Sequence, residues 1–194
     1  GDWSSDVCSS DLIDTVNKRI TTNQGDVIAY DKLVLATGSY AFVPPIPGNE
    51  RENCFVYRTI DDLDAIRAAS LNAKSGVVIG GGLLGLEAAK ALRDLDLETH
   101  VVEFAPRLMA VQIDDLGGKV LRAKIENLGV KVHTQKATSA IEAGQNSTHL
   151  MKFGDGSELE TDIILFSAGI RPRDELARQS GLVLGERGGI VIDR

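Results

Sequence analysis

The stretch that decides the fold spans residues 75–104 and reads "SGVVIGGGLLGLEAAKALRDLDLETHVVEF". It begins with a short apolar run, residues 77–79, which predicts a buried strand. Three glycines with the spacing G-x-G-x-x-G come next, and they are Gly80, Gly82 and Gly85. A helical pattern opens at Leu83 and Leu84, and a second strand, "THVVE", ends on Glu103. This order of strand, glycine turn, helix and strand predicts a dinucleotide-binding unit.

Each glycine has its own physical role in such a unit. Gly80 permits the tight turn, Gly82 lets a pyrophosphate approach the backbone, and Gly85 lets the helix and the strand pack closely. The start of the helix, at Leu83 and Leu84, offers unpaired N–H groups and a positive dipole end to the phosphates. We therefore expect the pyrophosphate of a nicotinamide dinucleotide at this turn.

The acid that ends the second strand bears on which cofactor is used. Glu103 lies 18 residues past Gly85, close to the spacing expected for a carboxylate on the adenosine ribose hydroxyls. A carboxylate repels a 2′-phosphate, so the sequence predicts NADH, with NADPH possible. Arg107 could grip a phosphate and partly reverse that preference, or it could be an ordinary solvated side chain.

A further helix is predicted by "TIDDLDAIRAASL". Thr59 can cap this helix, with Asp62 three residues later in a capping-box arrangement. One face of the helix should pack against a sheet, and its expected apolar residues are Ile60, Leu63 and Ile66.

The remaining patterns complete an α/β fold. "LGGKVLRAKIENLG" predicts a helix, "VKVHT" a third strand and "DIILFSAG" a last parallel strand, while Asp155-Gly156 is a strong hairpin signal between two others. Residues 33–35 form an apolar run typical of a strand buried on both faces. We expect a Rossmann-like NAD(P)-binding domain with a central parallel sheet, helices on one side and an antiparallel β-meander on the other.

Composition excludes several classes of partner. The 194-residue chain has a formal net charge of −7, no basic stripe and no apolar run long enough to span a bilayer, so we expect neither nucleic acid nor membrane. With only two cysteines and no CxxC pair, a cytoplasmic location is expected. No cysteine or second histidine lies at metal-ligand spacing from any histidine, so we expect no metal site. Packing in the core or at the surface is the expected role of His100, His133 and His149.

The opening residues, "GDWSSDVCSSDL", follow neither a helical nor a strand pattern. Residues 2–12 match the translation of the end of a common short-read sequencing adapter; the other reading is a disordered tail rich in serine and aspartate. We expect residues 1–12 to be a non-native, adapter-derived segment that packs on nothing, with the natural chain starting near Ile13. Without this segment, 21 basic and 25 acidic residues give a net charge of −4.

Several stretches together resemble a known family. "YDKLVLATGSYAFVPPIPG" is similar to the end of the first FAD segment of two-dinucleotide flavoproteins in the pyridine-nucleotide reductase class, and "ILFSAGIRPRDELA" to the motif that closes their NAD domain. More narrowly, "CFVYRTIDDLDAI", "GGGLLGLEAA" and "ETHVVEFAPRLM" are similar to the large subunits of assimilatory NAD(P)H nitrite reductases. The resemblance covers residues 25–193.

The resemblance implies further site residues. The segment that lies against the FAD is matched by Thr37, Gly38 and Ser39. Glu87 matches a glutamate near the nicotinamide and flavin rings, although a carboxylate on the first turn of a helix also suits the helix dipole. The loop beside the nicotinamide is matched by Gly169 and Ile170. Asp96 stands where relatives usually carry a glycine in the left-handed conformation that ends the helix, which aspartate tolerates better than most residues.

The resemblance also implies a division of the chain. Residues 13–45 match the end of the first FAD-binding segment, 46–172 the NAD(P)-binding domain, and 173–194 the return toward a second FAD segment. The FAD pyrophosphate motif is then expected before residue 13, and the motif that holds the ribityl chain after Arg194. Sirohaem and a [4Fe–4S] cluster belong to regions outside this chain, as no four-cysteine set is present.

Three functions follow as hypotheses. The first is the electron-entry module of a nitrite reductase large subunit, in which NAD(P)H reduces FAD, with a small subunit and a second copy of the chain as partners of the complete protein. The second is a rubredoxin- or ferredoxin-type reductase with the same core. The third is a flavoprotein used for NADH-responsive binding or signalling.

Overall fold

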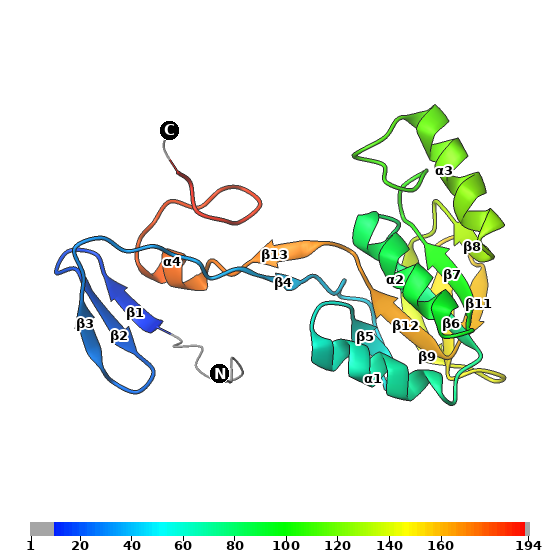
Figure 1. Cartoon of the computed structure of the whole chain (residues 1–194), viewed down its shortest axis with the longest axis horizontal. Helices are drawn as coiled ribbons and strands as arrows, with labels where there is room; N and C mark the ends of the chain where they lie inside the picture. Colours follow the sequence, from blue (N-terminus) through cyan, green and yellow to red (C-terminus); the bar gives the residue numbers. More distant parts are fainter. Residues whose placement is uncertain (1–9, 193–194) are drawn as a thin grey trace. The chain divides into compact units, whose positions relative to one another are not determined.

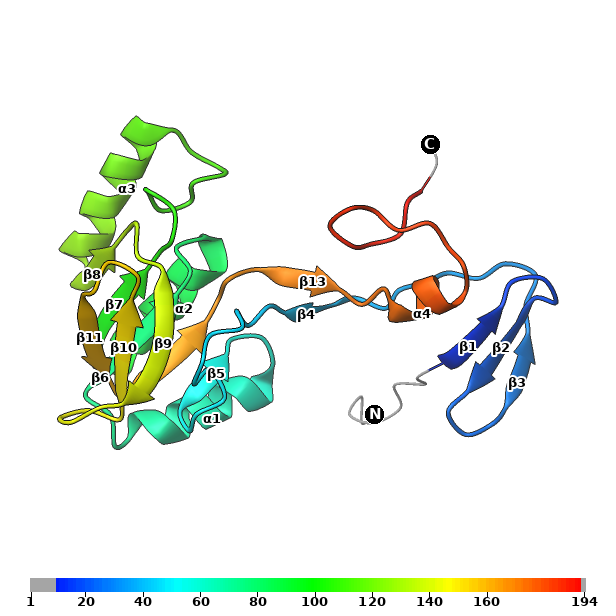
Figure 2. The ribbon, with the colours of Figure 1, turned by 180° about the vertical axis from the view of Figure 1, so that it is seen from behind.

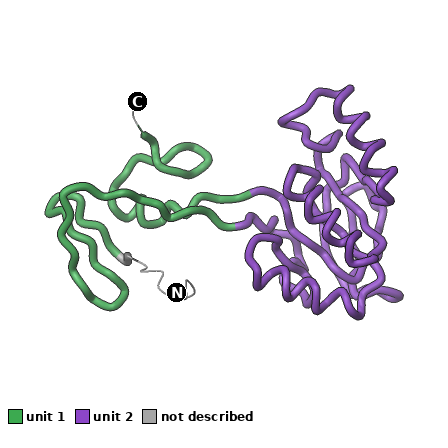
Figure 3. The backbone as a smooth tube through the Cα atoms, viewed as in Figure 1, with its two compact units in different colours: residues 1–40, 170–194 green, residues 41–169 purple. Residues whose placement is uncertain are grey.

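The computed structural model describes residues 10–192, so most of the predicted adapter-derived segment, residues 1–9, lies outside the described residues. The chain divides into two compact units (Figure 3). Unit 1 contains residues 1–40 and 170–194, and unit 2 contains residues 41–169. The predicted boundaries, after residues 45 and 172, lie a few residues from these positions.

Unit 2 is built on a five-stranded parallel sheet with the strand order β5-β12-β6-β7-β8. Its strands are β5 (Cys54–Val56), β6 (Ser75–Ile79), β7 (Glu98–Val102), β8 (Val130–His133) and β12 (Ile163–Phe166). One face is covered by α1 (Ile60–Ser70), α2 (Leu83–Asp94) and α3 (Asp115–Asn127). The other face is covered by an antiparallel meander, β9 (Thr138–Ala143), β10 (His149–Phe153) and β11 (Glu158–Thr161) (Figures 1 and 2). The predicted Rossmann-like α/β class is confirmed.

The sheet separates two hydrophobic cores because side chains alternate along each strand. The core on the helical face contains Val78, Val101 and Leu165, packed with Ala88 and Leu92 of α2. The core on the meander face contains Val77, Val102 and Ile164, packed with Ile141, Met151 and Phe153. The strands are therefore apolar on both faces, which explains why they read as continuous hydrophobic runs in the sequence.

Helix α1 begins where the sequence predicted, but the apolar residues expected to pack against the sheet are not all buried. The Thr59 hydroxyl accepts from the Asp62 N–H and the Asp62 carboxylate accepts from the Thr59 N–H, which completes the capping box. Only Ile66 is buried, whereas Ile60 is 76% exposed and Leu63 is 43% exposed. The expectation that all three pack together was wrong, because positions six residues apart lie about 120° apart around a helix.

Unit 1 contains an antiparallel sheet of β1 (Ser10–Asp14), β2 (Arg19–Thr22) and β3 (Val27–Ala29). It also contains the helix α4 (Glu175–Gln179), and β4 (Ser39–Ala41) pairs with β13 (Ile170–Pro172). Leu12 pairs with Thr21 of β2, so the end of the predicted adapter-derived segment does pack, through backbone pairing that any side chain allows. The strand predicted at residues 33–35 is not formed, and Val34 is 85% exposed, because no described residue pairs with this stretch.

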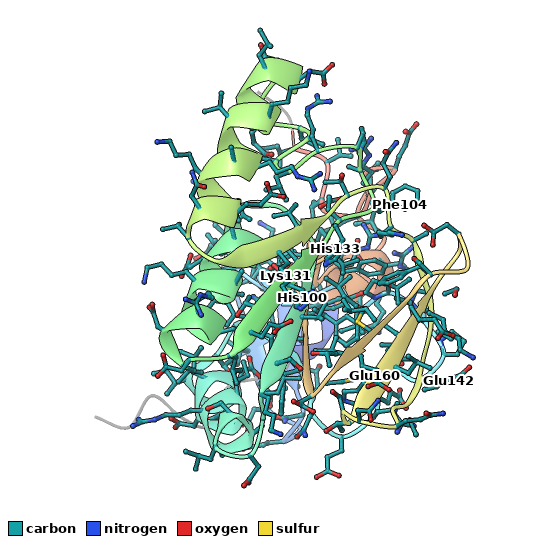
Figure 4. The ribbon with its side chains drawn as sticks, turned by 90° about the vertical axis from the view of Figure 1, so that its right-hand side faces the viewer. His100, Phe104, Lys131, His133, Glu142 and Glu160 are labelled. Carbon is teal, nitrogen blue, oxygen red and sulfur yellow. The ribbon has the colours of Figure 1, made fainter. Side chains whose placement is uncertain are left out.

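The three histidines lie in strands of unit 2. His149 is fully buried, and His100 is 5% exposed. The rings of His100 and His133 are stacked, with Nδ1 of His100 3.0 Å from Nε2 of His133, and Lys131 lies near them (Figure 4). Burial lowers the pKa of all three imidazoles, and Arg51 adds to this effect at His149. They are thus favoured in the neutral form.

The lowered pKa values of these histidines imply that the stability of the fold depends on pH. Because their pKa values are lower in the folded than in the unfolded chain, the unfolded chain binds more protons as the pH falls below about 6.5. We expect the free energy of unfolding, measured with urea, to fall between pH 7 and pH 5. The described carboxylates with shifted pKa values, such as Glu98 and Asp162, have lowered values and stay ionised in this window. A stability that does not change between pH 7 and pH 5 would contradict this expectation.

The ends of α2 and α3 offer a matched pair for a second prediction. Asp96 follows the last turn of α2 with φ +61°, and Gly129 follows α3 with φ +84°, so both residues are left-handed as expected for this position. Asp96→Gly should raise the free energy of unfolding by about 0.5–1 kcal/mol, since it removes side-chain strain and a negative charge beside a helix C-terminus. Gly129→Asp should lower it by about as much. Denaturant titration of both variants checks the pair, and a loss in Asp96→Gly would show that this side chain stabilises the fold.

Candidate dinucleotide-binding site

The turn after β6 requires glycine for two separate reasons. Gly80 has φ +120°, a conformation that L side chains rarely adopt, and a Cβ there would lie 2.3 Å from the Ser167 carbonyl oxygen. A Cβ on Gly85 would lie 2.0 Å from the Gly80 carbonyl oxygen. These two close approaches hold the start of α2 against the ends of β6 and β12.

Gly82 differs from the other two motif glycines. A Cβ at this position would meet no atom within 4 Å. The space beside the backbone is therefore available to a ligand, as the predicted approach of a pyrophosphate requires. Gly82 is also the N-cap of α2 and has no side chain to cap it, and the first turn contains no acidic residue. The helix begins at Leu83 and Leu84, and no carboxylate in its first turn neutralises the positive end of its dipole.

Glu87 lies farther along α2 than the sequence suggested. Because α2 begins at Leu83, Glu87 stands in the second turn, so a helix-dipole role on the first turn is not supported. The Glu87 side chain is exposed. The pKa of the Tyr57 phenol is raised first by the burial of Tyr57 and second by the negative charge of Glu87. Proximity of Glu87 to a nicotinamide or flavin ring stays a prediction.

Glu103 is anchored to the glycine turn. Its Oε2 accepts from the Gly81 N–H at 2.6 Å, and its Oε1 accepts from the Ala105 N–H at 2.7 Å. Each carboxylate oxygen has two lone pairs, so both can still accept from a ribose hydroxyl. The carboxylate is therefore oriented at the carboxyl edge of the sheet before any ligand binds.

Gly81 is a site residue that the sequence reasoning passed over. Besides donating to Glu103, it accepts at its carbonyl from the Met109 N–H at 2.9 Å. A Cβ on Gly81 would lie 2.6 Å from Cδ2 of the buried Leu108. The signal was the middle glycine of "GGG", which the spacing G-x-G-x-x-G treats as a free position.

Arg107 is held by protein groups, and its side chain is 28% exposed. Its guanidinium donates to the carbonyls of Ile113 and Ala110 at 3.1 and 3.0 Å and forms an ion pair with Asp115 at 2.8 Å. Its side chain also packs on Gly118 of α3. The expectation of an ordinary solvated side chain is therefore wrong. A contact with a 2′-phosphate stays a prediction.

A cavity of about 530 Å³ opens at the carboxyl edge of the sheet in unit 2. Gly80, Gly82 and Glu103 line it together with Ser167 and Ala168 from the end of β12. Its remaining lining residues are Phe42, Pro44, Ile46, Ile79, Val102, Phe104, Lys136, Ala137 and Thr138. Glycine backbone, a helix start and an oriented carboxylate thus meet at one cavity, and this set fits an adenosine diphosphate moiety.

The predicted FAD-contacting residues lie in unit 1. The Thr37 hydroxyl donates to the Arg173 carbonyl at 2.7 Å, and the Gly38 carbonyl accepts from the Arg173 N–H at 3.0 Å. Thr37 and Gly38 line a cavity of about 480 Å³, whereas Ser39 begins β4 and accepts at its carbonyl from Arg173 Nε. Gly169, with φ +106°, ends unit 2, and Ile170 begins β13 with 57% exposure.

Residues 10–192 contain no group of three or more His, Cys, Asp or Glu side chains that could hold a metal ion. Within the same residues, no helix has the length and apolar character needed to cross a membrane.

Comparison with known proteins identifies the relatives. The sequence pattern of the pyridine nucleotide-disulphide oxidoreductases matches residues 7–194. The large subunit of nitrite reductase [NAD(P)H] from Klebsiella oxytoca is 65% identical over 164 residues, covering 84% of this chain and 17% of that protein. The corresponding NADH-dependent subunit from Escherichia coli (strain K12) is 56% identical, covering 92% of this chain and 22% of that protein.

A solved structure agrees with these sequence relatives. A ferredoxin reductase from Rhodopseudomonas palustris matches with a TM-score of 0.86 and 29% identity, over 93% of this chain and 44% of that structure. The resemblance read from the motifs is confirmed. The chain spans about a fifth of the length of the curated nitrite reductase relatives it matches.

The geometry of Glu103 predicts how cofactor affinity responds to substitution. Glu103→Ala should weaken NADH binding by about 1–3 kcal/mol, because it removes charged hydrogen bonds to a ribose and also frees the Gly81 N–H. NADPH should lose less affinity, or gain some, because the repulsion of its 2′-phosphate disappears. Glu103→Gln is the matched control that keeps the shape without the charge. Fluorescence titration with both nucleotides measures these changes. Equal losses of affinity for NADH and NADPH would show that Glu103 does not bind the ribose.

Proposed function

The chain belongs to the pyridine nucleotide-disulphide oxidoreductase family, and on this premise we propose that it is the NADH-binding, electron-entry module of a flavoprotein reductase. The observation that carries the proposal is the oriented carboxylate of Glu103 beside the open backbone of Gly82. When both cofactors are bound, the nicotinamide supplies a hydride and the flavin accepts it, so the redox chemistry belongs to the cofactors.

The residues of this chain bind and orient the dinucleotide. The N–H groups at the start of α2 receive the pyrophosphate, and Gly82 leaves room for it. Glu103 accepts from the adenosine ribose hydroxyls while the backbone N–H groups of Gly81 and Ala105 hold it in place. The same carboxylate makes NADH the preferred nucleotide and NADPH the weaker one.

The flavin is proposed to contact unit 1. Thr37 and Gly38 line the 480 Å³ cavity there, and a Cβ on Gly38 would meet no atom within 4 Å, which leaves room beside its backbone for a planar ring. Glu87, Gly169 and Ile170 are proposed to face the reacting rings, with Glu87 offering an exposed carboxylate on α2. In the complete protein, FAD is proposed to accept the hydride of NADH.

We further propose that the parent protein is a nitrite reductase large subunit. The 65% identity to the Klebsiella oxytoca protein supports this reading. Reduction of nitrite at sirohaem and a [4Fe–4S] cluster, a small subunit and a homodimer are parts of the same proposal. A cytoplasmic location fits the free thiol of Cys54, the single cysteine among residues 10–192. The likeness to a ferredoxin reductase keeps a ferredoxin- or rubredoxin-type reductase as the second candidate.

NADH binding by the chain tests the module itself. Wild-type chain should bind NADH measurably, and Gly82→Val should weaken binding by roughly tenfold or more, because the new side chain fills the space for the pyrophosphate without touching the protein. Gly154→Val is the matched control, since a Cβ there makes only ordinary contacts and the residue lies outside the cavity lining. Fluorescence titration with thermal melts measures both. Equal affinity of the Gly82→Val variant would refute binding at this turn.

The nitrite proposal is tested by exchanging the matching segment of the Klebsiella oxytoca large subunit for this chain. The chimera should keep NADH-dependent nitrite reduction, and Gly82→Val within it should lower that activity at limiting NADH by the factor by which binding weakens. Its FAD content and its NADH-dependent reduction of ferricyanide report whether the electron-entry module is intact. A chimera that reduces ferricyanide but not nitrite would favour the ferredoxin-type alternative.

A further inference from the structure

The backbone of Glu103 is held by the end of β8 and by the loop that follows it, residues 134–137. The Glu103 N–H donates to the His133 carbonyl at 2.8 Å. The Glu103 carbonyl accepts from the Lys136 N–H at 3.0 Å. Because both backbone groups of Glu103 are bonded to this segment, the position of the loop sets where the carboxylate lies.

The loop itself is held in a conformation that its sequence does not favour. Gln135 has φ +58°, in the left-handed region that few residues other than glycine, asparagine and aspartate adopt readily. Its N–H donates to the Ala105 carbonyl at 3.0 Å, so this conformation also contributes to the support beside Glu103. Backbone strain of this kind persists only where the surrounding structure maintains it. The loop therefore requires contacts with another part of the fold.

The hairpin turn between β10 and β11 supplies these contacts. The Lys136 ammonium forms an ion pair with the Asp155 carboxylate and donates to the Ser157 hydroxyl at 2.6 Å. The Gly154 N–H donates to the Ala137 carbonyl at 2.9 Å. The hydrogen bond from Lys136, followed by those from Ser157, holds the pKa of the Asp155 carboxyl well below its usual range. Asp155 is therefore ionised at neutral pH and binds the lysine as a charge.

Asp155 has no direct access to a ligand in the cavity. Lys136 lines the 530 Å³ cavity, whereas Asp155 and Ser157 are not among its lining residues. The Lys136 ammonium also lies 5.5 Å from the centroid of the Phe153 ring, which belongs to the core on the meander face. Any effect of Asp155 on ligand binding must therefore pass through Lys136 and the loop that carries it.

We propose that Asp155 is a positioning residue for the carboxylate of Glu103. Asp155 fixes Lys136, and the loop around Lys136 fixes the backbone of Glu103. This proposal rests on the proposed NADH function and adds a residue of the β10–β11 hairpin to the support of the site. Loss of the Asp155 charge should loosen a group that is oriented before binding, and so weaken NADH although no ligand contact is removed.

Substitution of Asp155 tests its effect on affinity. Asp155→Asn retains an acceptor for the Ser157 N–H and the shape of the turn, but it removes the charge that binds Lys136. The dissociation constant of NADH, from fluorescence titration, should rise about two- to fivefold, the scale of a partly exposed ion pair. Asp155→Glu, which keeps the charge, should bind NADH more tightly than Asp155→Asn. Glu158→Gln is the matched control, because it removes the same charge from an exposed residue of the same hairpin outside the cavity lining, and it should change nothing.

Two further measurements separate positioning from a structural role. Hydrogen exchange of the Gln135 and Lys136 amides in the chain without ligand should be faster in Asp155→Asn and unchanged in Glu158→Gln. In a Glu103→Ala chain, Asp155→Asn should cause no further loss of NADH affinity, because no carboxylate is left to position.

The outcomes distinguish this inference from the proposed function. A lower melting temperature of Asp155→Asn with unchanged NADH affinity would mean a purely structural ion pair and would overturn the positioning role. The same fold loss from Asp155→Asn with and without the Glu103 carboxylate would overturn it as well. In both cases wild-type NADH binding stands. A wild-type chain that does not bind NADH overturns the proposed function and this inference together.

Discussion

The site depends on how closely helix α2 approaches the turn after β6. A Cβ on Gly85 would lie 2.0 Å from the Gly80 carbonyl oxygen, so any side chain there would push the helix away from the sheet. The same displacement would pull Ala88 and Leu92 out of the core on the helical face. The phosphate-binding geometry and the packing of this face are therefore one constraint, and they cannot be optimised separately.

Glu103 extends this constraint from packing to charge. Its carboxylate is tied to Gly81 and Ala105, and Gly81 is tied in turn to Met109. An acid proposed to bind the ribose thus also fixes the turn that is proposed to hold the pyrophosphate. Orientation of the group before binding lowers the entropy lost when a ligand arrives, which is how a rigid site gains affinity. The chemistry of recognition and the local stability of the turn share the same hydrogen bonds.

Features with local causes were predictable from the sequence, and features with distant causes were not. The glycine motif, the Thr59–Asp62 capping box and the left-handed Asp96 each follow from neighbours along the chain. The contacts of Arg107 with the loop before α3 depend on how that loop folds back. The Thr138 hydroxyl has no hydrogen-bond partner among residues 10–192, and its environment depends on strands of the meander that pair later in the sequence. The face of α1 was misassigned because apolar residues at three-residue spacing drift around a helix, and only the sheet decides which of them is buried.

The glycine at the start of α2 has a consequence for the dynamics of the molecule. A helix that begins with Ser, Thr or Asp carries its own cap, whereas Gly82 leaves the first N–H groups to solvent or to a bound anion. In the proposed complex, the diphosphate of a dinucleotide takes the place of a side chain as the helix cap, and this cap is present only while the ligand is bound. We therefore expect the first turn of α2 to fray more readily when no ligand is bound, so that the order of this turn reports whether the site is occupied.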